Sequence, residues 1–145
     1  MKAAGDVVSL SALQSVENVR RLESLLGDLP QVDMQTQTLI HGRMAARAIF
    51  IPAGTLLTGV LTNVDNISIM VGDITVTTEA GPVRLTGFHV LPASAGAKRA
   101  GIAHADTWWA TLHHTDLTDI ADIEAEMTSE PENLQTRRLA LAVVK

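Results

Sequence analysis

A run of short segments with an apolar residue at every second position begins at Leu39, and it constrains the fold more than any other feature of the chain. Such a period of two is typical of strands with one buried face. Turn signals rich in glycine, proline, aspartate and asparagine divide the run. We therefore predict strands near residues 44–51, 55–63, 67–71, 73–78, 82–87, 88–92, 98–104 and 107–114. Eight short strands with close turns indicate a mainly β chain that folds as a jelly-roll barrel.

The segment before this run has the period of an amphipathic helix. Ser11 and Gln14 fit a capping box, and Gly27 followed by Pro30 is a stop signal. The apolar stripe of this helix consists of Leu13, Val16, Val19, Leu22 and Leu25 or Leu26. The stripe has two alternative partners, the outside of its own barrel or neighbouring copies, and amphipathicity does not choose between them. Residues 28–38 have neither period and are expected to form an extended connector.

The C-terminal segment is predicted to contain short helices and an apolar tail. Thr118 is the expected cap of an acidic helix that ends at Met127, and Ser129 is expected to start another. The tail then carries Leu139, Leu141 and Val143 at alternate positions. Because a free apolar strand promotes aggregation, we expect this tail to pair with the edge of its own barrel or of a neighbour.

Length and composition fit one folded domain with two arms. The chain has 145 residues, 46% of them hydrophobic, which is enough for a single core. Only 3% of residues are aromatic, so a pocket lined with rings is not expected. We divide the chain into an N-terminal helical arm and connector at 1–38, a barrel at 39–116, and a C-terminal helical segment with the apolar tail at 117–145.

Charge and cysteine content exclude several classes of function. The net charge of −5 argues against a nucleic-acid partner, which would need clustered basic residues. The absence of cysteine excludes disulfides, cysteine metal sites and a cysteine nucleophile. No apolar run is long enough to span a bilayer, and the first residues lack the apolar core of a signal peptide. We therefore expect a protein made in the cytoplasm that has no membrane partner.

Several sequence blocks resemble a group of small cupin-like proteins encoded in tailed-bacteriophage and prophage genomes. The resemblance covers about residues 30–138 and rests on the blocks IPAGTLLTG, GDITVTTE, RLTGFHVLPASAG and AHADTWWATLH. It implies a cupin-like jelly roll. Members of this group are mostly known as hypothetical or virion-associated proteins, so the resemblance says more about fold than about function.

The resemblance also locates the position where enzymatic cupins bind a metal through histidines. Aligning the first cupin motif on Gly72 places Asp65 at its acid position, but no histidine precedes Asp65 between residues 58 and 64. In a loosely matching second motif, Arg99 stands near the expected histidine. A guanidinium offers no lone pair to a cation, and a catalytic metal needs about three protein ligands. We therefore expect no metal and no other cofactor.

The five histidines leave one alternative metal site open. His104 and the adjacent His113 and His114 lie near the ends of neighbouring predicted strands, so they are candidates for a substitute site. Exposed or hydrogen-bonded histidines are the preferred interpretation of this group. His89 lies within an apolar strand and is expected to be a satisfied core or interface histidine, whereas His41 lies where a strand begins.

No pattern in the chain predicts catalysis. Ser94 lacks the spacing and the strand-turn-helix context of a nucleophilic serine, so we interpret it as a turn residue. The acidic residues between 116 and 130 are expected to form a solvated helix face. No glycine-rich phosphate loop follows a strand and opens a helix. We therefore predict that the protein is not an enzyme.

Trp108 and Trp109 are the remaining singular feature. On a strand they face opposite ways, so one should enter the core while the other lies at a contact. Together with the apolar arms, they predict a homo-oligomer. The candidate interface residues are Leu13, Val16, Val19, Leu22, Trp108, Trp109, Leu139, Leu141 and Val143.

Taken with the resemblance, these features predict a non-enzymatic structural protein of a phage virion. The favoured version is a capsid decoration or cement protein that oligomerises, contacts other phage structural proteins, the major capsid protein first, and stabilises the particle. One alternative is a binding module associated with the tail or baseplate. A third is a cupin-type small-molecule-binding protein or metalloenzyme that uses His104 and His113.

Overall fold

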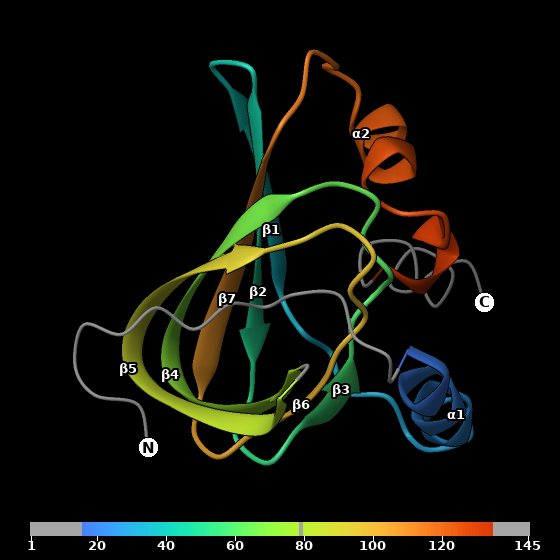
Figure 1. Ribbon diagram of the computed structural model, residues 1–145, viewed down its shortest axis with the longest axis vertical. Coiled ribbons are helices and arrows are strands. Elements are labelled where there is room, and N and C mark those ends of the chain that lie inside the picture. The colour runs from blue at the N-terminus through green and yellow to red at the C-terminus, as the bar shows by residue number, and fades with distance from the viewer. Residues whose placement is uncertain (1–15, 79, 135–145) are drawn as a thin grey trace.

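The computed structural model describes residues 16–78 and 80–134, which form a curled antiparallel sheet with helices on one side (Figure 1). The helices are α1 (Val16–Leu26), α2 (Ile120–Met127) and the short 3-10 helix η1 (Pro131–Asn133). The strands are β1 (Thr36–His41), β2 (Met44–Ile51), β3 (Leu56–Thr58), β4 (Asn66–Thr78), β5 (Gly81–Ala93), β6 (Ala100–Ala103) and β7 (Thr107–His114). The predictions on Ser11, Leu13, Gln14, Leu139, Leu141 and Val143 fall outside the described residues.

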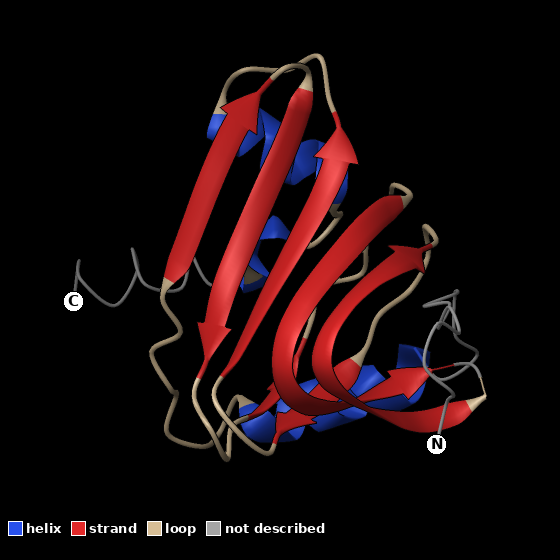
Figure 2. Ribbon diagram, turned by 90° about the vertical axis from the view of Figure 1, so that its left-hand side faces the viewer, coloured by secondary structure: helices blue, strands red, loops and turns tan. Residues whose placement is uncertain are grey.

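Strand β4 is the centre of the sheet. Its full length pairs with β5 on one edge, while its other edge pairs first with β7 and then with β6. The order is β1-β2-β7-β4-β6-β3, with β5 beside β4, and all pairs are antiparallel. Figure 2 shows how strongly β4 and β5 bend, which curls the sheet into an open barrel. The mainly β jelly roll predicted from the sequence is confirmed.

The bend in β4 and β5 centres on two glycines that face each other, Gly72 and Gly87. The sequence predicted strand breaks at both places, but each strand continues through its glycine. Gly72 has φ +144°, and a Cβ there would lie 2.7 Å from the Cα of Thr107 and 2.8 Å from the carbonyl oxygen of Asp106. The missing side chain therefore lets β4 bend tightly against the start of β7.

Two other predicted boundaries are wrong. The strand expected at 55–63 ends at Thr58, because the following residues leave the ladder. The last three residues of the expected connector, Thr36, Gln37 and Thr38, belong to the edge strand β1. Because all three are polar, the sequence did not predict a strand there. The sequence of β1 does not alternate between apolar and polar residues, because this edge strand has one half-buried face and one exposed face and no deeply buried face.

The expected caps of the C-terminal helices are also different. Asp119, and not Thr118, caps α2, and its side chain accepts a hydrogen bond from the backbone N–H of Asp122. Glu130, and not Ser129, occupies the cap position of η1. Carboxylates suit both positions because they lie at the positive end of a helix.

The core lies between the concave faces of the bent strands. It is built almost wholly from aliphatic side chains, namely Ile51, Met70, Ile74, Val76, Leu85, Leu91, Ala93 and Ala103. Burial of this apolar surface is the main source of stability in such a fold. Within the described residues, the helices are too short and polar to cross a membrane.

Candidate functional site

A cavity of about 140 Å³ lies inside the barrel beside this core. Two arginines line it, Arg47 from β2 and Arg99 from the residue before β6. The other polar lining residues are Thr62, Trp109 and Thr111. The rest of the lining is apolar or glycine: Ile49, Ile51, Leu57, Gly59, Val60, Ile74, Val76, Ala100, Gly101 and Met127. The cavity is thus an apolar chamber that contains two cationic side chains.

Three polar atoms of this lining are buried without a hydrogen-bond partner among the described residues. They are the Nε of Arg47, the Nη1 of Arg99 and the Oγ1 of Thr62. Burial lowers the pKa of Arg99 to about 10. Burial also lowers the pKa of Arg47, and the charge of Glu124 on α2 opposes that change. Both guanidiniums remain charged at neutral pH, and each keeps a buried N–H donor that has no hydrogen-bond partner among the described residues.

The residue next to Arg99 is buried in a very different way. Lys98 is 0% exposed, and its Nζ donates to the Oε2 of Glu23 at 3.0 Å, to the carbonyl oxygen of Gly59 at 2.9 Å and to the Oε1 of Glu130. Burial raises the pKa of Glu130, but the hydrogen bonds from Lys98 and from the Leu61 N–H outweigh it, so the pKa lies below its usual value. Lys98 is therefore a fully compensated cation that joins α1 and the C-terminal segment to the barrel.

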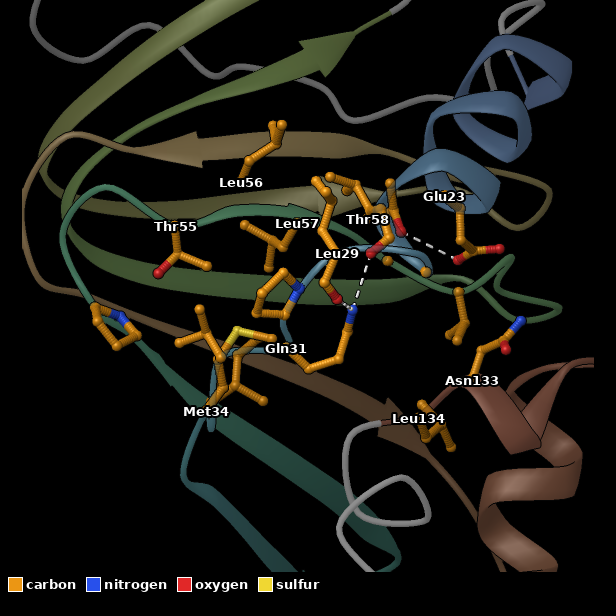
Figure 3. Close-up of a pocket in the computed structure, with 18 of the residues that line it drawn as sticks. Glu23, Leu29, Gln31, Met34, Thr55, Leu56, Leu57, Thr58, Asn133 and Leu134 are labelled. Carbon is orange, nitrogen blue, oxygen red and sulfur yellow. Dashed lines mark hydrogen bonds between the residues drawn. The ribbon is translucent and has the colours of Figure 1, made fainter. Parts of the chain in front are cut away.

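A second, larger pocket of about 490 Å³ adjoins the first (Figure 3). It lies between α1, the connector at 29–34, the β2–β3 region and η1, and it shares Arg47, Leu57 and Gly59 with the inner cavity. The Nε2 of Gln31 donates to the carbonyl oxygens of Leu26 and Leu29, which fixes the connector along the pocket wall. The shared residues show that the two pockets are neighbours separated by side chains of β2 and of the β3 region.

The residues do not fit the metal site of enzymatic cupins. Asp65 is exposed, and its Oδ1 accepts a hydrogen bond from the backbone N–H of Ala95, so it fixes a turn. Arg99 lines the barrel interior in place of a ligand. No group of three or more His, Asp or Glu side chains in the described part of the chain could hold an ion. The expectation of a metal-free protein itself remains a prediction.

The histidines proposed as substitute ligands lie apart. His104 precedes β7, and its Nε2 lies 2.7 Å from the Oγ1 of Thr75. His113 is near the far end of β7, and six strand residues from Thr107 span about 20 Å. Its Nε2 lies 3.2 Å from the Oε1 of Glu126. The chain therefore does not bring His104 and His113 into one site.

The remaining polar candidates have structural environments. His89 is half-buried, with its Nε2 2.9 Å from the carbonyl oxygen of Thr86, and His41 and His114 are exposed. Ser94 is exposed in the turn between β5 and β6. The acidic helix is not wholly solvated as expected, because Glu124 is buried near Arg47.

The candidate interface residues divide into inner and outer ones. Val19 is 3% exposed, and α1 packs beside β3, so the helix stripe rests on its own barrel, with Val16 and Leu22 half-buried. Trp109 packs against the core, whereas Trp108 is 39% exposed and its ring centre lies 5.0 Å from that of Phe50. The two tryptophans thus face opposite sides of β7, as predicted.

Trp108 belongs to a broad apolar surface on the outside of the sheet. The strand register places three rows of residues side by side across β1, β2, β7, β4 and β5. The rows are Phe50, Trp108, Val71 and Phe88; Ala48, Ala110, Ile69 and Val90, which the polar Gln37 of β1 adjoins; and Leu39, Ala46, Leu112, Ile67 and Pro92. We call these residues the apolar face; Figure 2 shows the strands that carry them, with the helices behind the sheet.

None of the residues of the apolar face is charged, and its large side chains are solvent-accessible. Phe88 is 67% exposed, and Leu39, Val90, Ile67 and Val71 are also classed as exposed. Five strands at about 4.8 Å spacing make the face about 19 Å wide. Large contiguous apolar patches of this kind mark interaction sites. Sequence reasoning found only Trp108, because the face exists only once the strands are aligned.

The same two strands become polar beyond Gly72 and Gly87. Arg84 of β5 donates from its Nε and Nη2 to the two carboxylate oxygens of Asp73 at 2.9 and 2.7 Å. That hydrogen bond lowers the pKa of Asp73. Thr75 pairs with His104 on the same outer side. On β4 and β5 the apolar face therefore ends at the bend, although Ile102 of β6 and Leu56 of β3 are exposed beside Thr75.

Comparison with known proteins gives structural neighbours only. The chain has 18% identity to KdgF from Halomonas over 64% of this chain and 87% of that one, with a TM-score of 0.51. This chain has a cupin fold. A cupin superfamily protein from Desulfitobacterium hafniense has 16% identity over 66% and 88% of the two chains, with a TM-score of 0.49. A Streptococcus pyogenes protein of unknown function has 14% identity over 81% and 93%, with a TM-score of 0.47.

No family model matches the sequence, and no curated protein matches it. At such identities, likeness to a cupin structure shows the fold alone. The neighbours carry no indication of a phage source. The function of this chain must therefore be argued from its own surfaces and cavity.

Proposed function

We propose that this chain is a non-enzymatic structural protein that assembles with further copies of itself through the apolar face. The observation that carries the proposal is the alignment of apolar residues in three rows across β2, β7, β4 and β5, one of which continues to Leu39 of β1. Exposed aromatic residues, here Trp108 and Phe88, are typical anchors of protein interfaces. Covering them removes apolar surface from water, which is the main driving force of association.

A second copy is the occupant that the charge distribution favours. The chain has a net charge of −5, yet none of this charge lies on the apolar face. A two-fold interface brings the same patch of two subunits together, so any charge on it would meet itself. An uncharged apolar face is complementary to its own copy, while the acidic remainder of the surface keeps the assembly soluble.

The resemblance to phage-encoded cupin-like proteins supports placing this assembly on a virion, as a capsid decoration or cement protein. In this proposal the major capsid protein is the first partner, and the protein is made in the host cytoplasm before it joins the particle. A module of the tail or baseplate would use the same apolar face. The copy number of the protein in purified particles distinguishes a capsid protein from a tail or baseplate module. A decoration protein should be present in a fixed ratio to the major capsid protein, because it binds at each equivalent position of the capsid lattice.

The chemistry of the barrel supports a non-enzymatic role. The cavity lining contains no carboxylate, histidine or serine among the described residues. General acid–base catalysis and nucleophilic catalysis both need such groups in contact with the substrate. Two guanidiniums that stay charged can bind and orient a ligand, but at neutral pH they do not exchange protons with it.

Light scattering of the purified protein tests the assembly, with Ile69→Asp and Ile102→Asp as a matched pair of variants. Both are isoleucines of the sheet, but only Ile69 belongs to the apolar face, whereas Ile102 of β6 is exposed beside Thr75. We expect the natural protein and Ile102→Asp to be oligomers and Ile69→Asp to be a folded monomer. A monomeric natural protein, or equal masses for the two variants, would refute the proposed interface.

A further inference from the structure

The inner cavity has the composition of a site for a small negatively charged molecule. Arg47, Arg99 and Thr62 come from three separate segments and converge on a space of about 140 Å³. Each contributes a buried polar atom that has no partner among the described residues. An unpaired buried donor loses the hydrogen bond it made to water and is costly to the fold. The arrangement is therefore expected to be completed by a ligand.

The neighbouring lysine shows how this chain compensates a buried cation for structural purposes. Lys98 is bound by two carboxylates and a carbonyl oxygen. The carboxylate that faces Arg47 is Glu124, and burial is the sole cause of the lowered pKa of Arg99. Among the described residues, the Nη1 of Arg99 thus has no partner in the cavity, and the Nε of Arg47 is the second unpaired donor there.

We infer that the cavity binds a small organic carboxylate, with its charged end at Arg99 and Arg47 and its apolar body against the aliphatic wall. A guanidinium and a carboxylate match in planar, two-point hydrogen bonding. Apart from Thr62, Trp109 and Thr111, the remaining lining is apolar or glycine, so it offers fewer partners than the outer oxygens of a phosphate or sulfate need. At about 30 Å³ per water molecule, the volume suits a ligand of on the order of five heavy atoms.

The cavity and the apolar face lie on opposite sides of the same strands. Trp109 lines the cavity, while its neighbour Trp108 lies on the apolar face. Ligand binding and self-association can therefore be tested separately. In particular, the Ile69→Asp variant used to test association leaves the residues of the cavity unchanged.

Calorimetry and Trp109 fluorescence test the inference, with butyrate as the probe. A chloride salt at the same ionic strength is the reference for each measurement. The matched variants are Arg99→Met, which removes the charge but keeps the length, and Arg84→Met, which removes an exposed arginine. We expect saturable butyrate binding to the natural protein and to Arg84→Met, and binding at least about tenfold weaker in Arg99→Met. Butyramide, which has the same shape without the charge, is expected not to bind.

The melting temperature of Arg99→Met without ligand is a second measurement. It should rise if Arg99 serves to bind a ligand and fall if Arg99 only holds the fold together. Because Arg99 is buried and its Nη1 has no partner among the described residues, Arg99→Met is expected to melt at a higher temperature than the natural protein without ligand. If Arg99→Met does not fold, the structural role is established and the inference is wrong. Equal binding of butyramide, binding of phosphate or sulfate in place of butyrate, or no saturable binding of butyrate would also overturn it.

Discussion

The two halves of the β4–β5 hairpin differ in what they present to solvent, although they are made by the same pair of strands. On one side of Gly72 and Gly87 the outer residues are apolar, as in Val71 and Phe88. On the other side they are polar and paired with each other, as in Asp73 and Arg84. The polar side chains are satisfied by one another and by water. The apolar half leaves hydrophobic surface exposed to water until another surface covers it.

The inner sides of these two halves show no such difference. Met70 and Leu91 in one half and Ile74 and Leu85 in the other all belong to the same core. The change is therefore confined to residues that the folding of one chain does not need. The apolar outer residues are therefore not explained by packing of the core, and a role outside the fold of one chain explains them most simply.

The largest effect is expected where the two halves meet. Gly72→Ala places a Cβ against backbone atoms of Thr107 and Asp106, which cannot move as a flexible side chain can. We expect a loss of more than about 4 kcal/mol in the free energy of unfolding. Gly87→Ala is the control, because its Cβ would meet nothing within 4 Å and only the positive φ costs about 1 kcal/mol. Chemical denaturation measures both, and equal losses would show that the bend does not depend on the contact with β7.

The two tryptophans separate the inner and outer sides of β7. Trp109→Ala removes a ring packed on the core and is expected to cost about 3 kcal/mol of stability. Trp108→Ala should leave the melting temperature of the monomeric state nearly unchanged and weaken association instead. Thermal melts in the Ile69→Asp background, which removes association, measure the fold alone. If Trp108→Ala melts as early as Trp109→Ala there, the outer ring is part of the fold and the contrast fails.

Moving the border of the apolar face should change association in either direction. Phe88→Thr shortens the face by one aromatic anchor, and we expect about tenfold weaker association. Thr86→Phe extends the apolar surface beyond Gly87 and should strengthen it. Analytical ultracentrifugation over a dilution series gives both dissociation constants. If both variants changed the dissociation constant in the same direction, the interface would lie elsewhere on the protein.

The smallest effect is expected on the polar half. The lowered pKa of Asp73 contributes stability that is present above its unfolded pKa and lost as pH falls through the lower, folded pKa. Arg84 is exposed and Asp73 is only partly buried, so Asp73→Asn should change the melting temperature little at pH 7 and should flatten its fall below about pH 4. A large loss at neutral pH would mean that this half also depends on a specific contact.

The sequence predicted the strands with regular alternation and missed those without it. The limits of β2 and β7 match, because both alternate and end at clear turn signals. At Gly72 and Gly87 it predicted breaks, since a glycine in a turn and a glycine in a bent strand look alike. The departure of Arg99 from the cupin pattern was visible, but its meeting with Arg47 required the folded chain. The rows of the apolar face likewise depend on register between distant strands.

Lys98 has a consequence for how the two arms behave. Glu23 of α1 and Glu130 near η1 bind the same ammonium, though they lie far apart in the sequence. The two carboxylates repel each other across that ammonium, so detachment of one leaves the other as the sole anionic partner and strengthens its hold on Lys98. The arms should accordingly undock one at a time, and a protease that frees α1 should leave the segment around Glu130 attached to the barrel.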